Sequence, residues 1–185
     1  MQIIAWVAAH QLDPPMAVIR APQSRMADKG FDGLMISLDD KRQLRGIIVC
    51  EEKATENPRD TVREEVWPEV RKLEAGERDG ELFSEVTTLL YKLKATDPAF
   101  DIDGALAAID WSRHRVYRVS VTIETSRDNV KGHAALFKGY DNVAPGCIDR
   151  RHGETVCLAP LREWMDGFCG LVLDQLSTLE SAAHV

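Results

Sequence analysis

Strand-like runs and helix-like segments alternate along this chain, and their order is the feature that most limits the fold. An apolar stretch in the first ten residues has the length of a short helix, and the prolines at 14 and 15 stop it. Strand-like runs, helices, a strand, a helix, a strand and a last helix follow. The order predicts one α/β domain over residues 1–185, with a mixed central sheet flanked by helices.

The clearest strand signals form a hairpin. Residues 31–36 are predicted as one strand, residues 39–41 as the turn and residues 45–53 as the return strand, which contains the apolar run 47–50. A shorter strand-like run at residues 16–20 precedes them. In a hairpin the start of the first strand lies beside the end of the second.

Helical spacing follows the hairpin. Asn57 and Pro58 suit an N-cap and a first helical position, and Gly76 suits the helix end. Pro68 lies inside this segment and is expected to kink or divide it. The apolar stripe of this helix is Val62, Val66, Val70 and Leu73. Further helices are predicted at residues 79–93 and 104–109. The apolar stripe of the first of them is Leu82, Phe83, Val86, Leu89, Leu90 and Leu93.

The last part of the chain predicts two strands and two helices. Residues 114–124 alternate apolar and polar side chains, which is typical of a half-buried strand. A helix is predicted from Ser126 to Phe137, and a short strand at residues 155–158. The apolar face of the last helix, between Leu161 and Leu179, is interpreted as one wall of the core.

Composition excludes several classes of protein. Hydrophobic residues make up 44% and charged residues 29%, which excludes a wholly disordered chain. The net charge of -7 is unlike that of a protein held to nucleic acid by bulk charge. No apolar run approaches the ~20 residues of a membrane helix, and the four cysteines match no disulfide framework. The expectation is a cytoplasmic protein without a membrane segment.

Asp32, Glu51 and Lys53 are the candidate catalytic residues. Glu51 and Lys53 are two apart in a strand and project from one face, where the strand changes from apolar to charged. Asp32 begins the preceding strand, so it can converge with Glu51. Two carboxylates suit Mg²⁺ or Mn²⁺, and a lysine beside them can stabilise charge on a phosphoryl group. The alternative is a salt bridge at a strand end.

This pattern resembles the PD-(D/E)xK nuclease superfamily, which has the restriction-endonuclease-like fold. The resemblance covers residues 28–75 and implies that Asp32 and Glu51 bind the metal and that Lys53 is the motif lysine. It implies metal-dependent cleavage of DNA. Phe31 stands where the family has proline, and residues 1–12 hold no acid to match a frequent N-terminal glutamate. The chain is therefore expected to lack part of the family's N-terminal region, or to dispense with that ligand.

A shorter resemblance concerns the stretch Gly-His-Ala-Ala-Leu-Phe at residues 132–137. It is similar to the nuclease subunit of the bacterial Hachiman anti-phage system, which works with a helicase. The resemblance implies a role in antiviral defence and a helicase partner. DNA affinity would otherwise come from a homodimer, because the chain has little basic charge.

Six basic residues are predicted to contact nucleic-acid phosphates. They are Lys41, Arg42, Arg45, Arg59, Arg113 and Arg115. Charge that protects a solvated strand edge is the alternative explanation. For the whole chain, the alternative to a nuclease is a non-catalytic interaction or regulatory module that keeps the nuclease fold.

Overall fold

The computed structural model describes residues 6–7, 17–21, 31–157 and 160–183. Trp6 and Val7 are helical, and the rest of the helix predicted in the first ten residues lies outside the described residues, as do the prolines at 14 and 15.

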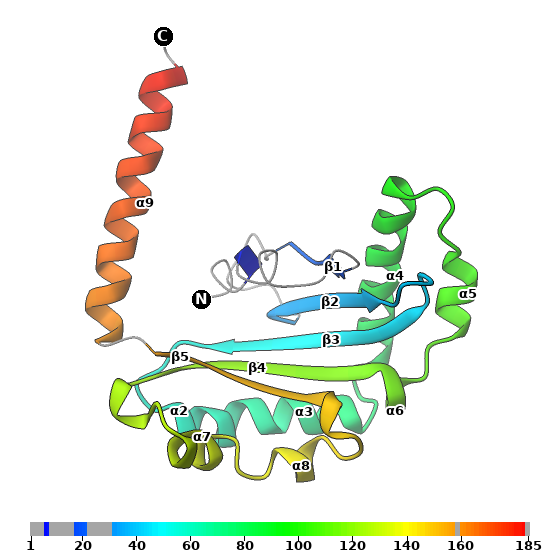
Figure 1. Ribbon diagram of the computed structural model, residues 1–185, viewed down its shortest axis with the longest axis horizontal. Coiled ribbons are helices and arrows are strands. Elements are labelled where there is room, and N and C mark those ends of the chain that lie inside the picture. The colour runs from blue at the N-terminus through cyan, green and yellow to red at the C-terminus, as the bar shows by residue number, and fades with distance from the viewer. Residues whose placement is uncertain (1–5, 8–16, 22–30, 158–159, 184–185) are drawn as a thin grey trace.

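A five-stranded mixed sheet forms the centre of the part of the chain that the structure describes (Figure 1). Its strands lie in chain order: β1 (Ala17–Ile19), β2 (Gly33–Leu38), β3 (Leu44–Lys53), β4 (Arg115–Ile123) and β5 (Arg151–Cys157). The first three strands pair antiparallel, and β3, β4 and β5 pair parallel. The mixed α/β prediction is confirmed, and so is the predicted hairpin.

The β2–β3 hairpin contains one irregularity that matters later. Ser37 pairs with Gly46 and Leu38 pairs with Leu44, so Arg45 is an extra residue in β3. This β-bulge changes the direction of one side chain and increases the local twist. In the turn, the Asp39 carboxylate accepts hydrogen bonds from the backbone N–H groups of Lys41 and Gln43.

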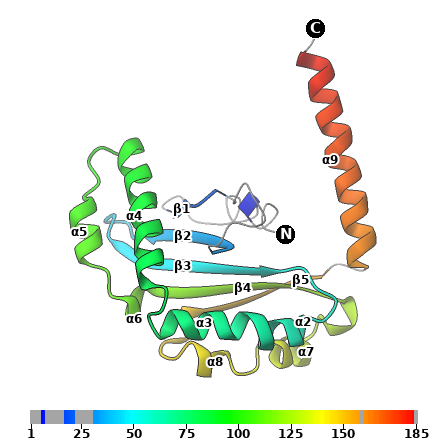
Figure 2. The ribbon, with the colours of Figure 1, turned by 180° about the vertical axis from the view of Figure 1, so that it is seen from behind.

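One face of the sheet is covered by helices (Figure 2). After β3 the chain forms α2 (Pro58–Thr61), a π-helical turn η1 (Val62–Val66) and α3 (Trp67–Glu74). The predicted stripe packs onto this face, and its four members are each at most 1% exposed. They meet the alternate residues Ile47 and Val49 of β3 in one core.

Pro68 explains why this helix is irregular. A proline inside a helix cannot donate to the carbonyl four residues earlier, and its ring crowds that carbonyl. The turn before it widens, so that the Trp67 N–H donates to the carbonyl of Val62, five residues back. The predicted division of the helix is therefore confirmed, and it takes the form of a π-helical turn, a feature that is frequent at functional sites.

A second helical unit covers the same face toward β1 and β2. It comprises α4 (Asp79–Thr96), α5 (Ile102–Ala107) and α6 (Trp111–His114). The buried side of α4 carries Leu82, Val86, Leu89 and Leu90, as its spacing predicts. Phe83, which was assigned to the same stripe, is 45% exposed.

Two predicted elements of the last part have different bounds. The helix predicted over 126–137 is a 3-10 turn η2 (Thr125–Arg127) followed by α7 (Val130–Leu136). A new helix begins after Asn129, whose side chain caps it by accepting a hydrogen bond from the Gly132 N–H. β5 begins at Arg151 rather than at residue 155, since pairing with β4 extends it through a polar segment that carries no apolar pattern. Between them lie α8 (Tyr140–Val143) and a 3-10 turn η3 (Ile148–Arg150).

The prediction that the last helix is a wall of the core is wrong for this chain. Helix α9 (Leu161–Ala183) extends away from the sheet (Figures 1 and 2). Its apolar face is open, with Leu171 71% and Leu179 56% exposed. Across the described ranges, no helix has both the length and the apolar character needed to span a membrane.

Candidate functional site

The hairpin brings the three predicted residues together. Gly33 pairs with Cys50, so Asp32, one residue earlier, reaches the level of Glu51. Gly33 permits this close approach, because a Cβ there would lie 3.0 Å from the Cβ of Cys50. The Glu52 N–H donates to Asp32 Oδ2 at 3.1 Å, which fixes the aspartate at the end of β3.

Lys53 links the two carboxylates. Its Nζ lies 3.3 Å from Glu51 Oε2 and 3.6 Å from Asp32 Oδ2. Glu51 is 8% exposed, whereas Asp32 and Lys53 remain about one-third and one-quarter exposed at their side chains (34% and 26%). The cluster is thus dry on the side of the core and open on the side of the strand end.

Burial dominates the electrostatics of this cluster. The pKa of Glu51 is raised from 4.5 to about 7, first by burial and second by the nearby charge of Asp32, while Lys53 acts in the opposite direction. Burial lowers the pKa of Lys53, but the attraction of Glu51 and Asp32 is larger, and the net shift is upward. Lys53 is therefore held as a cation between two acids, one of which accepts a proton near neutral pH.

The helix after β3 adds two acidic residues that the sequence analysis did not single out. Glu65 in η1 raises the pKa of Lys53, and Glu69 in α3 raises the pKa of Glu51. They are four residues apart on the helix that directly follows the motif, and this spacing was the available signal. Glu69 also forms ion pairs with Lys72 at 2.6 Å and with Arg78 at 3.4 Å.

Glu52 lies on the opposite face of β3 from Glu51. The Glu52 side chain is half-buried, and its Oε2 finds no hydrogen-bond partner in the described part of the chain. Burial, followed by the charge of Asp32, raises its pKa to about 7.

The donor set of the cluster fits a hard divalent cation. Mg²⁺ is commonly held by one or two carboxylates while waters or phosphate oxygens complete its shell. Asp32 and Glu51 provide two carboxylates at a partly open strand end. No group of three or more His, Cys, Asp or Glu side chains arranged for a metal occurs among the residues that the structure describes.

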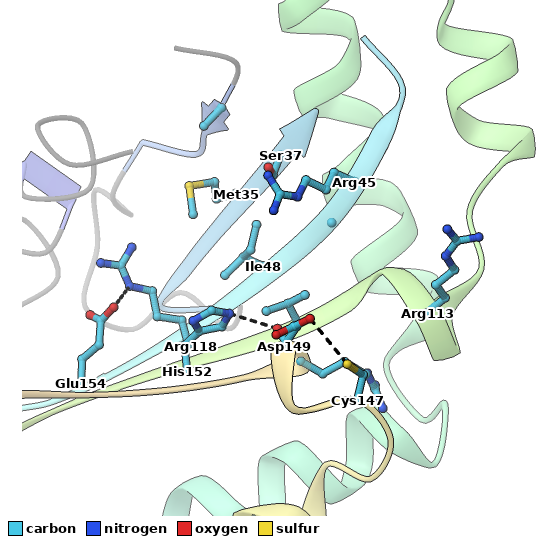
Figure 3. A pocket seen from close by; sticks show the side chains of 14 residues that line it. Met35, Ser37, Arg45, Ile48, Arg113, Arg118, Cys147, Asp149, His152 and Glu154 are labelled. Atoms are coloured by element: carbon cyan, nitrogen blue, oxygen red, sulfur yellow. Dashed lines mark hydrogen bonds and ion pairs between the residues drawn. The ribbon is translucent and has the colours of Figure 1, made fainter. Parts of the chain in front are cut away.

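Four of the six predicted phosphate contacts do not lie beside this cluster. Lys41 and Arg42 are in the β2–β3 turn, and Arg45 is eight residues before Lys53, about 25 Å along the strand. Arg42 forms an ion pair with Asp97 at 2.7 Å. Arg45 and Arg113 border a cleft on the other face of the sheet (Figure 3).

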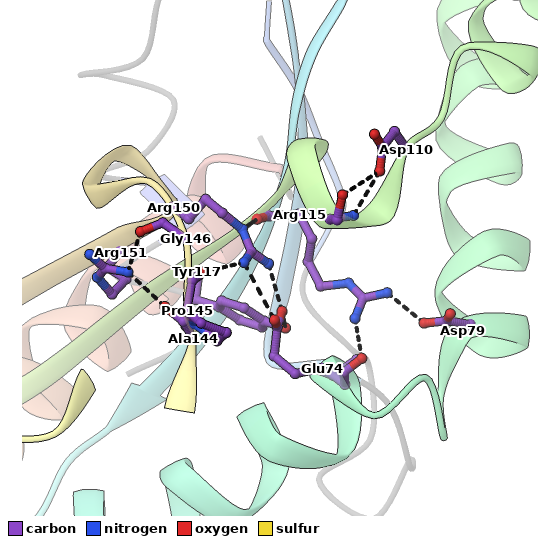
Figure 4. Close-up of polar contacts among 12 residues, drawn as sticks. Glu74, Asp79, Asp110, Arg115, Tyr117, Ala144, Pro145, Gly146, Arg150 and Arg151 are labelled. Atoms are coloured by element: carbon purple, nitrogen blue, oxygen red, sulfur yellow. Dashed lines mark hydrogen bonds and ion pairs between the residues drawn. The ribbon is translucent and has the colours of Figure 1, made fainter. Parts of the chain in front are cut away.

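Arg115 is a structural residue, which corrects its assignment as a phosphate contact. It is 3% exposed, it pairs with Asp79 at 2.5 Å, and it donates to the carbonyl of Leu73 (Figure 4). Strand β4 begins here, beneath the end of α3, so this guanidinium ties the sheet to the α3–α4 connection. The Leu73 carbonyl and the Asp79 carboxylate that hold this guanidinium are more than 30 residues away in the sequence, so local sequence does not reveal its burial.

Arg150 completes the same network. Its guanidinium pairs with Glu74 at 2.6 Å and donates to the carbonyl of Arg115, and Tyr117 donates its hydroxyl to Glu74 (Figure 4). Arg59 is also occupied, because its Nη1 donates to the carbonyl of Leu136 at 2.9 Å. Of the six predicted contacts, it lies in the segment closest in sequence to Lys53.

The chain was compared with protein-family models, with curated proteins and with solved structures, and none of them matches it.

Proposed function

We propose that this protein is a Mg²⁺- or Mn²⁺-dependent nuclease that cleaves DNA phosphodiester bonds, and that its active site is formed by Asp32, Glu51 and Lys53. The proposal includes the restriction-endonuclease-like fold and, from the resemblance of residues 132–137, a role in bacterial anti-phage defence with a helicase partner. The observation that carries it is the convergence of both carboxylates on the Lys53 ammonium, at 3.6 and 3.3 Å.

Each residue has a distinct role in this proposal. Asp32 and Glu51 would hold the cation, which would polarise the phosphoryl group and lower the pKa of an attacking water when bound. Lys53 carries three donor hydrogens, so it can keep one on a carboxylate and offer another to a phosphoryl oxygen as negative charge develops there. The raised pKa of Glu51 means that cation binding must displace a proton near pH 7.

The topology around the motif also supports the proposal. An antiparallel hairpin carries the motif, and a helix and then strand β4 follow it, which is the order of elements that the resemblance implies. Strand β4 pairs parallel to β3. The π-helical turn and the acidic residues Glu65 and Glu69 border the same strand end.

The test is cleavage of plasmid and single-stranded DNA with Mn²⁺, Mg²⁺ or EDTA. We compare the wild type with Glu51→Gln, Lys53→Met and the control Glu64→Gln, whose exposed carboxylate pairs only with Arg63 in the described structure. Cutting should need metal, should fall at least a hundredfold in the first two variants and should persist in the control. Thermal melting in parallel should show stabilisation by Mn²⁺ that Glu51→Gln abolishes.

A non-catalytic interaction module is the second candidate, and the open apolar face of α9 favours it. If the protein is such a module, it should cut DNA with none of the metals. Mn²⁺ should then change the melting temperature of the wild type and of Glu51→Gln equally, and both proteins should melt cooperatively. This result would contradict the nuclease proposal.

A further inference from the structure

The face of the sheet opposite Glu51 holds a cleft of about 760 Å³ (Figure 3). This volume lies within the range of small-ligand sites in proteins. Its floor is formed by apolar side chains of three neighbouring strands, Met35, Ile48 and Val116. These residues alternate with the core-facing residues of the same strands, so the cleft and the carboxylate cluster are separated by the sheet itself.

Two arginines border this floor without partners of their own. Among the described residues, neither the Arg45 nor the Arg113 guanidinium makes a hydrogen bond or ion pair, and both are exposed. Arg45 is the extra residue of the β-bulge, which allows it and its neighbour Gly46 both to line the cleft. Bulges commonly redirect a side chain in this way at functional sites.

The other charged groups of the cleft are largely compensated. Arg118 forms an ion pair with Glu154 at 2.8 Å, and Arg150 forms one with Glu74. Asp149 accepts a weak hydrogen bond from Cys147, and the carbonyl of Asp149 contacts the His152 ring. The two arginines without partners therefore outweigh the one remaining acid, Asp149, and give the cleft a local positive charge. The net charge of the whole chain is -7.

We propose that this cleft binds a nucleoside phosphate, with Arg45 and Arg113 on the phosphate groups and the base on the apolar floor. A guanidinium offers a planar pair of donors that matches phosphate oxygens. Ser37, which pairs with Gly46 beside Arg45, offers a hydroxyl at the same edge. A planar base that lies on the apolar floor is removed from water, which favours binding. Inorganic phosphate has no apolar surface and gains nothing from this floor.

Binding is measured by the fluorescence of a methylanthraniloyl derivative of ATP, in EDTA so that no metal takes part. Arg45→Gln and Arg113→Gln should each raise the dissociation constant about tenfold, as expected for the loss of one charged hydrogen-bond partner. Arg63→Gln, which changes an exposed arginine on η1, should bind like the wild type. Melting curves of each variant show whether it is folded.

Cys147 provides a second readout that needs no substitution. It lines the cleft and is exposed, whereas Cys157 and Cys169 are exposed elsewhere. Saturating ATP should slow iodoacetamide alkylation of Cys147, followed by mass spectrometry, and should leave the other two cysteines unchanged.

Four results would overturn the inference. The first is the absence of binding, and the second is wild-type affinity in folded Arg45→Gln and Arg113→Gln. The third is competition by orthophosphate as strong as that by ATP, which would leave the apolar floor without a role. If a single-stranded oligonucleotide competes but ATP and AMP do not, the occupant is a nucleic acid and a nucleoside phosphate is wrong.

Discussion

The helical segment that follows β3 and the final helix α9 both carry an apolar stripe, and they differ in what covers it. Val66 and Leu73 are buried against the sheet, whereas Leu176 is 51% and Leu171 is 71% exposed. The first helix is joined to β3 by a short connection that returns it across the sheet, while α9 follows β5, the edge strand. An apolar stripe therefore predicts that a helix can bury one face, but the connections decide whether a surface is there to receive it.

Helix α4 packs into the same core as the helical segment after β3, so truncation of one of its buried leucines tests the covered side of this comparison, and it has the largest expected effect. Leu90 of α4 is fully buried, so Leu90→Ala should lower the free energy of unfolding by about 2–5 kcal/mol, through lost transfer energy and a residual cavity. Urea unfolding followed by circular dichroism measures it. A change below about 1 kcal/mol would mean that α4 is not packed as described.

The pH dependence of the free energy of unfolding tests how strongly the Glu51 carboxyl is shielded from water on the covered face of the sheet. The pKa of Glu51 is about 7 when folded and 4.5 when exposed, so the folded state binds more protons between these values. Stability should therefore decrease as the pH rises from about 4.5 to 7, by about 2 kcal/mol.

Glu51→Gln should flatten this profile, and Glu64→Gln should leave it unchanged. Part of the slope should remain in Glu51→Gln, because burial also raises the pKa of Glu52 to about 7. An identical slope in the wild type and Glu51→Gln would show that Glu51 is more hydrated than its 8% exposure indicates.

The turn between α3 and α4 positions the covered helices, and its expected effect is smaller. Gly76 has a φ of +78°, and the Glu77 N–H donates to the Lys72 carbonyl while the Gly76 N–H donates to Leu73, which is a Schellman motif. Gly76→Ala should destabilise the protein by about 1 kcal/mol, because an L side chain is strained there. Thermal melting compares it with Gly80→Ala, a helical position with open space around the Cβ, which should be neutral or slightly stabilising.

The smallest effect is expected on the uncovered side. Leu176→Ala in α9 makes the same chemical change as Leu90→Ala, but it should alter the free energy of unfolding by less than about 0.5 kcal/mol. The same urea experiment, run at two protein concentrations, checks it. A loss that approaches that of Leu90→Ala, and that grows with concentration, would show that another molecule covers α9 in solution.

Local pattern predicted much of the covered unit. Strand-like apolar runs marked β2 and β3, and alternation marked β4. The Asn57-Pro58 start and the Gly76 stop bounded the helical segment that follows β3. Asp32, Glu51 and Lys53 were found because a hairpin pairs residues that are near in sequence, so its register follows from the strands themselves. Asn57 stands at the N-cap as predicted, but its side chain makes no capping hydrogen bond; its backbone N–H donates to Thr55 Oγ1.

Residues whose surroundings come from distant segments could not be predicted in this way. Arg115 was assigned to phosphate binding, but α3 and Asp79 enclose it. Arg45 faces the open cleft because one bulge shifts the register of β3, which no spacing in the sequence reveals. Glu65 and Glu69 act on the charges of Lys53 and Glu51 because the helix that carries them packs beside the end of β3, and local spacing does not reveal this.

By itself the sequence determined the mixed α/β class, the hairpin and the meeting of two acids with a lysine, because these depend on backbone propensity, side-chain period and short-range pairing. The tertiary structure decided the burial of Glu51, the structural role of Arg115, the open cleft behind the sheet and the exposure of α9. Each of these depends on which surfaces meet across long chain separations. Such contacts are fixed by the packing of whole helices and strands against one another, and no local sequence pattern encodes that packing.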